Sequence, residues 1–416
     1  MKRFVLLVVV LLAGMQSVQA GGFQIGEMSA RSTGMGSAFT AVADDASAAW
    51  FNPSGVAFSE GMHIMLGGAA IIAPGTDYTP NAATVSRPGF PVQASTKSKN
   101  KTFFAPHAYY TFWDRAAGLG ASISVNSPFG LETDWARTSS LASSNTFTRL
   151  SMLAINPSVI FKMTDHISIS GGFSYVYLNK INLDNLAQQL EGKNKDGWGG
   201  TASLMAYYDH FRLGVNYRSR VAIDINGGTV VGGSVLGPLA GARTTANTKI
   251  TLPDSVNIGL AWQPSDTWLL SLDVDWTNWN TFNEVRINYA PSLLSTVLTG
   301  GTGTNVIPEN WKDTVSVRAG VEWHFVENMR ARFGYVYDPS PIDDVNFSPA
   351  IPGNDRQLFS LGYSYDFNAA ATLDLAYAYV YFRQRNQIAS VGVNAVRNGS
   401  YKTDIHIAVA SLQYAF

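Results

Sequence analysis

Apolar and polar side chains alternate in short stretches along most of the chain. Between Thr314 and Phe325, valine, alanine, tryptophan and phenylalanine occupy every second position, while glycine and polar residues occupy the positions between them. Leu373–Tyr381 alternates in the same way, with leucine and tyrosine on one parity. A period of two residues predicts β-strands whose two faces meet different surroundings.

The apolar face of these stretches is rich in aromatic residues, and the other face is small or polar. This division is typical of a transmembrane β-barrel, whose outer wall meets lipid and whose inner wall meets a polar lumen. About fourteen such stretches follow one another, and single-chain bacterial barrels have an even number of strands. The sequence therefore predicts an all-β fold, a transmembrane antiparallel β-barrel over residues 62–416.

The links between the predicted strands alternate in length. Short links such as Met163–His166 and Asn368–Ala371 alternate with long ones such as Pro74–Lys101 and Asp338–Arg356. Barrels of the bacterial outer membrane have short periplasmic turns and longer extracellular loops. The lengths therefore predict which end of the barrel faces the periplasm.

Two of the long links contain short helical patterns, at Leu183–Leu190 and Pro291–Leu298. Both patterns are apolar for surface loops. They are expected either to pack over the mouth of the barrel or to form an apolar landing site for a lipid-like ligand.

The N-terminal part of the chain differs from the strands. Lys2 and Arg3 precede an apolar run that ends near the small residue Ala20, which predicts a signal peptide over residues 1–20. The run is shorter than the roughly 20 residues that a spanning helix needs. Residues 21–61 are rich in glycine, alanine and serine and show no alternation. A small-residue segment placed before a membrane barrel is a candidate for an internal plug.

Composition supports the barrel and excludes several functions. Charged residues make up 14% of the chain, against about 25% in ordinary soluble domains. Aromatic residues make up 12%, and the net charge of −1 gives no electrostatic case for a nucleic-acid partner. The chain has no cysteine, so it forms no disulfide and no thiolate metal site.

Motifs of catalysis and metal binding are not evident in the sequence. The six histidines are scattered without the spacing of metal ligands. The chain contains no Gly-x-Ser-x-Gly nucleophile elbow. We therefore expect no metal site, no cofactor and no enzymatic activity.

Several motifs resemble those of one family. The segment after the predicted signal peptide contains Gly22-Phe23-Gln24, Ala43-Asp44-Asp45-Ala46 and Asn52-Pro53. Later come Trp311-Lys312-Asp313, Ile351-Pro352 before Asp355-Arg356, and the terminal Tyr414-Ala415-Phe416. These motifs resemble the FadL family, outer-membrane transporters of long-chain fatty acids and other hydrophobic compounds. The resemblance implies a barrel of about fourteen strands, with residues 21–61 as an N-terminal hatch domain that plugs the lumen and a lateral opening at a kinked third strand.

The predicted third strand ends in Asn126, Ser127, Pro128, Phe129 and Gly130. Proline has no N–H for the sheet ladder and glycine weakens a strand, so pairing is expected to fail locally here. The residues alone leave open whether Ser127 and Pro128 simply begin the next loop. The resemblance implies an inward kink that opens a gap in the wall.

A fatty-acid carboxylate that leaves water needs a cation or several hydrogen-bond donors. Lys312 and Lys180 both have the inward parity of their strands near the outer rim. The resemblance implies a ligand-binding role for Lys312, a weaker one for Lys180, and a place beside the ligand pocket for Phe23. Either lysine could instead be solvated at the rim, close to lipopolysaccharide.

Inward parity also predicts interior cations at Arg212, Arg218, Arg318 and Arg332. Asp44 and Asp45 of the predicted hatch are natural partners for them, and such pairs could hold the hatch while remaining breakable. The loss of one member would leave a partly buried charge unpaired. The resemblance adds Asn52 and Pro53 as hatch residues.

Sequence and resemblance together predict passive transport of long-chain fatty acids or other hydrophobic compounds across the Gram-negative outer membrane. In this prediction the cargo binds in the lumen, the hatch moves, and the cargo leaves sideways through the gap. A general aqueous diffusion porin is the main alternative. We further expect a monomer in contact with outer-membrane lipid and lipopolysaccharide, with Phe416 recognised by the barrel assembly machinery. A head-group lysine favours fatty acids over hydrocarbons only weakly.

Overall fold

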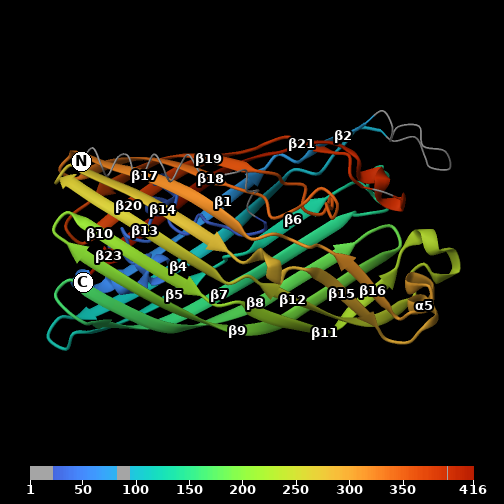
Figure 1. Ribbon diagram of the computed structural model, residues 1–416, viewed down its shortest axis with the longest axis horizontal. Helices are drawn as coiled ribbons and strands as arrows, with labels where there is room; N and C mark the ends of the chain where they lie inside the picture. The colour runs from blue at the N-terminus through green and yellow to red at the C-terminus, as the bar shows by residue number, and fades with distance from the viewer. Residues whose placement is uncertain (1–21, 82–93, 391) are drawn as a thin grey trace.

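The computed structural model describes residues 22–81, 94–390 and 392–416, so the predicted signal peptide lies outside the described residues. The chain forms a closed antiparallel β-barrel of 14 strands that is elongated along its axis (Figure 1). No helix in the described part of the chain is long and apolar enough to cross a membrane. The predicted all-β barrel is confirmed.

The barrel strands run antiparallel around the wall, some whole and some interrupted. The uninterrupted strands are β1 (Gly61–Ala73), β4 (Lys101–Asp114), β7 (Phe147–Lys162), β8 (Ile167–Asp184), β9 (Gln188–Tyr208), β18 (Met329–Asp338), β19 (Arg356–Asp366), β20 (Ala371–Phe382) and β23 (Asp404–Ala415). The interrupted strands are β5 (Leu119–Asn126) with β6 (Gly130–Asp134), β10 (Phe211–Arg218) with β11 (Val221–Gly232), β12 (Arg243–Leu252) with β13 (Ser255–Ser265), β14 (Trp268–Thr277) with β15 (Glu284–Tyr289), and β16 (Thr304–Pro308) with β17 (Thr314–Val326). β23 pairs with β1, which closes the barrel.

The two ends of the barrel differ as the loop lengths predict. Short turns lie at the end that also holds the C-terminus, and the long loops lie at the opposite end (Figure 1). Two of the long loops form a separate small sheet from β2 (Asp77–Pro80), β3 (Thr96–Lys97), β21 (Arg385–Gln387) and β22 (Gly399–Lys402). The long loops carry the 3-10 helices η2 (Ser234–Leu239) and η4 (Gly392–Arg397), whereas η3 (Trp279–Thr281) lies in the interruption between β14 and β15.

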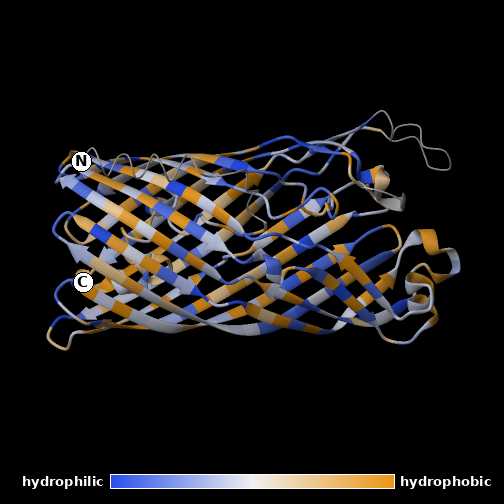
Figure 2. Cartoon of the chain, in the orientation of Figure 1, coloured by the Kyte–Doolittle hydropathy of each residue, from blue (hydrophilic) through white to orange (hydrophobic). Residues whose placement is uncertain are grey.

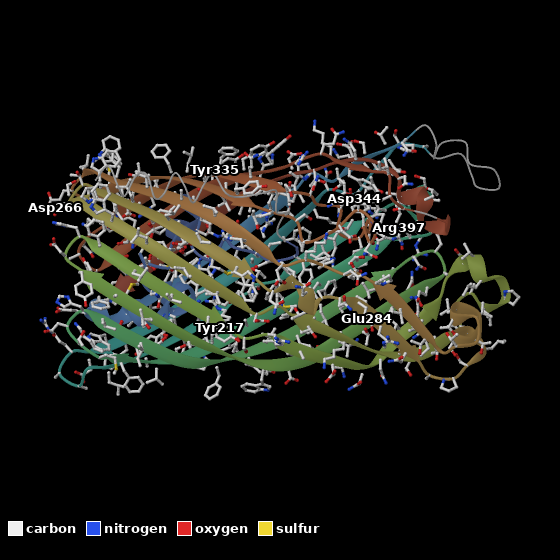
Figure 3. All side chains as sticks on the ribbon, viewed as in Figure 1. Tyr217, Asp266, Glu284, Tyr335, Asp344 and Arg397 are labelled. Atoms are coloured by element: carbon white, nitrogen blue, oxygen red, sulfur yellow. The ribbon has the colours of Figure 1, made fainter. Side chains whose placement is uncertain are left out.

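The period-2 pattern divides the wall into two faces. On β17 the Glu322 side chain is buried, whereas Trp323 and Phe325 are 40% and 38% exposed. Tyr217 and Tyr335 also lie on the outer wall (Figure 3). Figure 2 shows hydrophobic and hydrophilic residues alternating along the strands. The aromatic residues face outward because the outer surface of the barrel contacts lipid and not water.

One of the two predicted helices is confirmed and the other is wrong. α5 (Leu293–Thr299) begins with Ser292 as its N-cap and ends at Gly300, whose φ of 61° is left-handed. Leu183–Leu190 is instead a hairpin, in which Leu183 of β8 lies opposite Leu190 of β9. A three-residue turn places these leucines on one face just as a helix would, so spacing alone could not separate the two structures.

Residues 22–60 lie inside the barrel, and we call them the plug. The plug contains two short α-helices, α2 (Ala30–Gly34) and α3 (Ala48–Phe51), and the 3-10 helix η1 (Pro53–Phe58). α2 contacts β18, β19, β20 and β23, whereas η1 contacts β4, β5, β7, β8 and β9 across the lumen. Most of the plug is buried, so it fills the barrel at this level.

Glycines on both sides let the plug approach the wall. A Cβ atom at Gly334 of β18 would lie 1.9 Å from the Gly36 backbone nitrogen, and one at Gly362 of β19 would lie 2.9 Å from the Gly34 Cα. Real Cβ atoms do not approach other atoms so closely. The small residues of the plug are therefore matched by small residues in the wall.

Gly334→Ala is expected to loosen the plug, because the added Cβ would collide with plug backbone that has no side-chain freedom to yield. Overpacking of this kind costs about 1–3 kcal/mol. We expect a lower thermal unfolding temperature and a higher ion conductance in planar bilayers. Gly171→Ala is the matched control, since its Cβ would meet nothing within 4 Å. Equal conductance and stability of the two variants would contradict the role given to Gly334.

Candidate functional site

The third strand is interrupted at residues 127–129, between β5 and β6. β5 pairs with β4 as far as Val125 opposite Ala108, and both β5 and β6 pair with β7. Within the described residues β6 has no pairing with β4. Lys101–His107 of β4 therefore lack a ladder partner on this side. We call the space between this part of β4 and β6 the wall opening.

The first residues of the plug pair with the interruption. The Ile25 N–H donates to the Pro128 carbonyl oxygen at 2.9 Å, and the Gly130 N–H donates to the Phe23 carbonyl oxygen at 3.1 Å. Gln24 and Phe129 form the antiparallel bridge between these two bonds. Residues 23–25 thus supply backbone partners to the interruption, where the adjacent wall does not.

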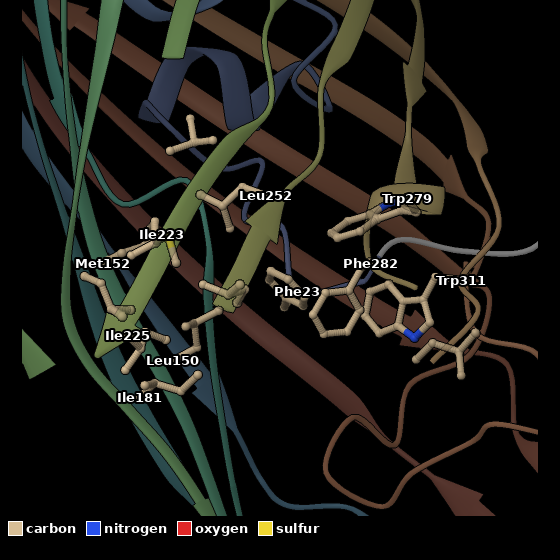
Figure 4. Close-up of a cluster of buried hydrophobic side chains, with 14 of the residues drawn as sticks. Phe23, Leu150, Met152, Ile181, Ile223, Ile225, Leu252, Trp279, Phe282 and Trp311 are labelled. Carbon is tan, nitrogen blue, oxygen red and sulfur yellow. The ribbon is translucent and has the colours of Figure 1, made fainter. Parts of the chain in front are cut away.

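Phe23 lies at the centre of an aromatic cluster (Figure 4). Its ring centroid is 5.1 Å from that of Trp279, 5.5 Å from Phe282, 5.6 Å from Trp311 and 5.8 Å from Phe129. Its side chain is 4% exposed. Edge-to-face contacts of this kind stabilise beyond the area that they bury, so the cluster anchors the start of the plug.

A cavity of about 520 Å³ adjoins the wall opening. It is lined by both edges of the opening, by the start of the plug and by the outer halves of neighbouring strands. Its apolar lining includes Phe23, Ile25, Phe103, Leu131, Leu150 and Met152. Cavities of 300–1,000 Å³ with a mostly apolar lining are typical of small-molecule sites.

Five cations also line this cavity, and each is paired with a carboxylate. The pairs are Lys99–Asp134 at 3.1 Å, Lys101–Glu132 at 2.9 Å, Arg149–Glu132 at 2.6 Å, Lys180–Glu191 at 2.6 Å and Arg356–Asp338 at 2.7 Å. Arg356 also donates to the Gln24 carbonyl oxygen at 3.4 Å. The cavity thus combines an apolar lining with cations that are engaged in ion pairs.

The two predicted head-group lysines lie in different places. Lys180 lines the cavity. Lys312 is exposed and does not line it, whereas the preceding Trp311 is buried in the aromatic cluster. The parity argument for Lys312 was wrong because β17 begins only at Thr314, so strand alternation does not extend to residue 312. Its ligand-binding role stays an untested prediction.

Buried ion pairs hold the plug to the wall. Arg31 of the plug contacts Asp44 at 2.5 Å and Asp45 at 3.4 Å, and it reaches Glu322 of β17 at 2.9 Å. Asp44 also pairs with Arg212 of β10 at 2.8 Å. Burial by itself raises the pKa of Asp44, but Arg31 and Arg212 hold it below its usual value. Asp44 is therefore the predicted aspartate that joins plug and wall.

The other inward arginines have different partners. Arg318 pairs with Asp275 at 2.5 Å, and Arg332 pairs with Glu322 at 2.5 Å, all on barrel strands. Arg218 lies over the plug residue Trp50, with its guanidinium carbon 3.7 Å from the ring centroid. Sequence reasoning missed Arg31 and Glu322, although the inward parity of Glu322 on β17 was a signal that could have found it.

Asn52 and Pro53 build the turn into η1. The Asn52 side-chain amide donates to the Thr40 carbonyl oxygen at 2.9 Å and to the Leu204 carbonyl oxygen of β9 at 3.0 Å. Its Oδ1 accepts from the Ser54 N–H at 3.2 Å, which caps the helix. Pro53 occupies the first turn of η1, where its missing N–H has no consequence.

A second cavity, of about 460 Å³, lies on the other side of the plug. Its lining includes Arg31, Asp44, Asp45 and Glu322, and it reaches Asp266 in the turn between β13 and β14. Asp266 lies at the end of the short turns (Figure 3). The plug therefore separates a largely apolar cavity from a polar one.

A closed antiparallel barrel with an aromatic outer wall and an internal plug is a protein of the bacterial outer membrane. The family model described as outer membrane protein transport protein (OMPP1/FadL/TodX) matches residues 10–416. The chain therefore belongs to this family of outer-membrane transport proteins.

Relatives of known name cover nearly the same length. A long-chain fatty acid transport protein of Escherichia coli O6:H1 is 25% identical over 410 residues, with 87% of each chain covered. A putative outer membrane protein of Neisseria meningitidis serogroup B is 27% identical, with 96% of this chain and 95% of the relative covered. Outer membrane protein P1 of Haemophilus influenzae is 24% identical over the full length of both.

Solved structures show the same fold. A FadL homologue of Pseudomonas aeruginosa superposes with a TM-score of 0.76 at 16% identity, covering 96% of this chain and 100% of that one. The toluene transporter TodX of Pseudomonas putida superposes with a TM-score of 0.69 at 17% identity, covering 96% and 99%. At this level of sequence identity, both similarities show a shared fold.

Arg31→Ala is expected to destabilise the protein by about 3 kcal/mol, because it removes the ion pair between the plug and Glu322 of β17 and leaves the buried Asp45 carboxylate without its cation. The measurement is thermal unfolding followed by heat-modifiable mobility in gels. Arg115→Ala is the control, since Arg115 pairs with Glu60 at the surface with 83% of its side chain exposed, and such pairs contribute at most about 1 kcal/mol. An equal effect of both variants would contradict the anchoring role of Arg31.

Proposed function

We propose that this protein carries hydrophobic compounds passively across the outer membrane through the cavity beside the wall opening. The observation that carries the proposal is the position of this cavity. It lies where β4 and β6 do not pair, so its apolar interior borders an interruption of the wall that the plug itself completes. Relatives named as a long-chain fatty acid transport protein and a toluene transporter support a hydrophobic cargo.

Cargo enters from the end of the long loops and binds in the cavity. The start of the plug then moves, because Phe23 and Ile25 line the cavity and also pair with the interruption. Two backbone hydrogen bonds, one hydrogen bond from Arg356 and one aromatic cluster hold this segment, whereas buried ion pairs and side-chain hydrogen bonds hold the rest of the plug. The segment of residues 22–25 is therefore the part that moves.

The cargo leaves sideways through the wall opening into the membrane. The vertical route would require an apolar molecule to pass the buried ion pairs of Arg31 and then the polar second cavity. Apolar surface is more stable in lipid than in such surroundings. Transfer into lipid follows this gradient, so the step needs no energy source, no cofactor and no chemical reaction.

An aqueous diffusion porin is the alternative function. A porin needs a continuous water channel, and the plug contacts the wall on both sides of the lumen. Low single-channel conductance of the wild-type protein in planar bilayers is the expected result. A conductance typical of open porins would favour the alternative.

Gly130→Trp is expected to reduce uptake of a hydrophobic compound to the level of cells without the transporter. Gly130 lines the cavity at the wall opening, and a Cβ there would meet the flexible end of Ile25 at 3.0 Å and the Leu150 carbonyl oxygen at an ordinary 3.8 Å, so the barrel is expected to fold. Uptake of a radiolabelled compound into a host lacking its own transporter measures the effect. Gly200→Trp is the control, since a Cβ there has one neighbour, at 3.6 Å. Full uptake by Gly130→Trp would contradict the lateral route.

A further inference from the structure

Every cation that lines the cavity is already engaged by a carboxylate of the protein. Lys99, Lys101, Arg149, Lys180 and Arg356 each lie within 3.1 Å of a carboxylate oxygen. A fatty-acid head group that approaches one of them therefore competes with a protein carboxylate. A neutral molecule meets no such competition.

Glu132 differs from the other carboxylates in these pairs. It lines the cavity itself, whereas Asp134, Glu191 and Asp338 pair with their cations from outside the lining. Its side chain is 6% exposed and contacts two cations at once, with Oε1 at 2.9 Å from Lys101 Nζ and Oε2 at 2.6 Å from Arg149 Nε. Both oxygens are thus engaged inside the binding space.

The contact with Lys101 crosses the wall opening. Lys101 belongs to β4 and Glu132 to β6, the two strands that form no backbone ladder with each other. Arg149 belongs to the next strand, β7, and within the described residues Glu132 is its only carboxylate partner. Glu132 therefore takes the position that the carboxylate of an amphipathic anion would need, at the edge by which cargo leaves.

We infer that Glu132 is a built-in counter-ion that sets the cargo preference of the cavity, favouring neutral hydrophobic compounds over fatty-acid anions. The inference rests on the proposed function of the cavity. With Glu132 in place, its carboxylate engages both Lys101 and Arg149, and an anionic head group meets a buried negative charge beside them. Without that charge, Arg149 becomes a free, partly buried guanidinium, which binds carboxylates strongly.

The test compares two ligands that share one chain and differ in head-group charge, dodecanol and dodecanoate. Binding to the purified full-length protein in a non-ionic detergent is measured at about pH 8, where a carboxylate is ionised. Glu132→Gln keeps the size and one acceptor oxygen of the side chain. It is expected to tighten the Kd for dodecanoate by ~10-fold, as loss of a like charge from a close pair does, and to leave dodecanol within about twofold.

Glu284→Gln is the matched control, because it removes the same charge from an exposed pair with Arg286 that does not line the cavity. It is expected to change neither Kd. This result would show that the effect of Glu132→Gln comes from its position at the cavity and not from the change in net charge of the protein. Heat-modifiable mobility checks that each variant is folded.

The outcomes separate the inference from the function on which it rests. An unchanged Kd for dodecanoate in folded Glu132→Gln, or an equal change for both ligands, would overturn the role of Glu132 while leaving the cavity as a cargo site. Failure of the wild-type protein to bind either ligand would overturn the proposed function, and the inference with it.

Discussion

The structure depends on one constraint, that a strand in lipid must find backbone partners within the protein. The barrel meets this constraint by closing β23 on β1, but the ladder fails between β4 and β6. There the plug supplies the missing partners, through Ile25 to Pro128 and through Phe23 to Gly130. The weakest part of the wall is thus completed by a segment from inside the lumen.

Two different kinds of interaction hold the plug, and they lie at different heights. Around Arg31, buried ion pairs fix the main body to β10 and β17. Around Phe23, aromatic rings and two backbone bonds fix its first residues. Breaking a buried ion pair leaves an uncompensated charge, whereas aromatic contacts can be exchanged for contacts with an apolar ligand. The proposed movement therefore concerns the first residues, while the body of the plug stays docked.

The same residues both close the wall opening and line the cavity in which cargo is proposed to bind. Phe23 and Ile25 both line the cavity and occupy the interruption, so a ligand that displaces them also removes partners from β6. On the same edge, Glu132 of β6 contacts Arg149 of β7 and also Lys101 of β4, across the opening. In the proposed function, displacement of Phe23 and Ile25 opens the lateral exit. The charge of Glu132 sets the preference for neutral cargo.

The sequence by itself determined the barrel and its strand faces, because period-2 alternation is a local pattern. It marked residues 21–61 as a candidate plug, but it left open whether Ser127 and Pro128 interrupt a strand or begin a loop. It did not distinguish the hairpin at Leu183–Leu190 from a helix, and it placed Lys312 in the lumen. The tertiary structure alone decided which charges meet. Arg31 of the plug meets Glu322 of β17, and Glu132 of β6 meets Lys101 of β4 across the wall opening. Local sequence patterns do not show which residues of such separate elements come within contact distance.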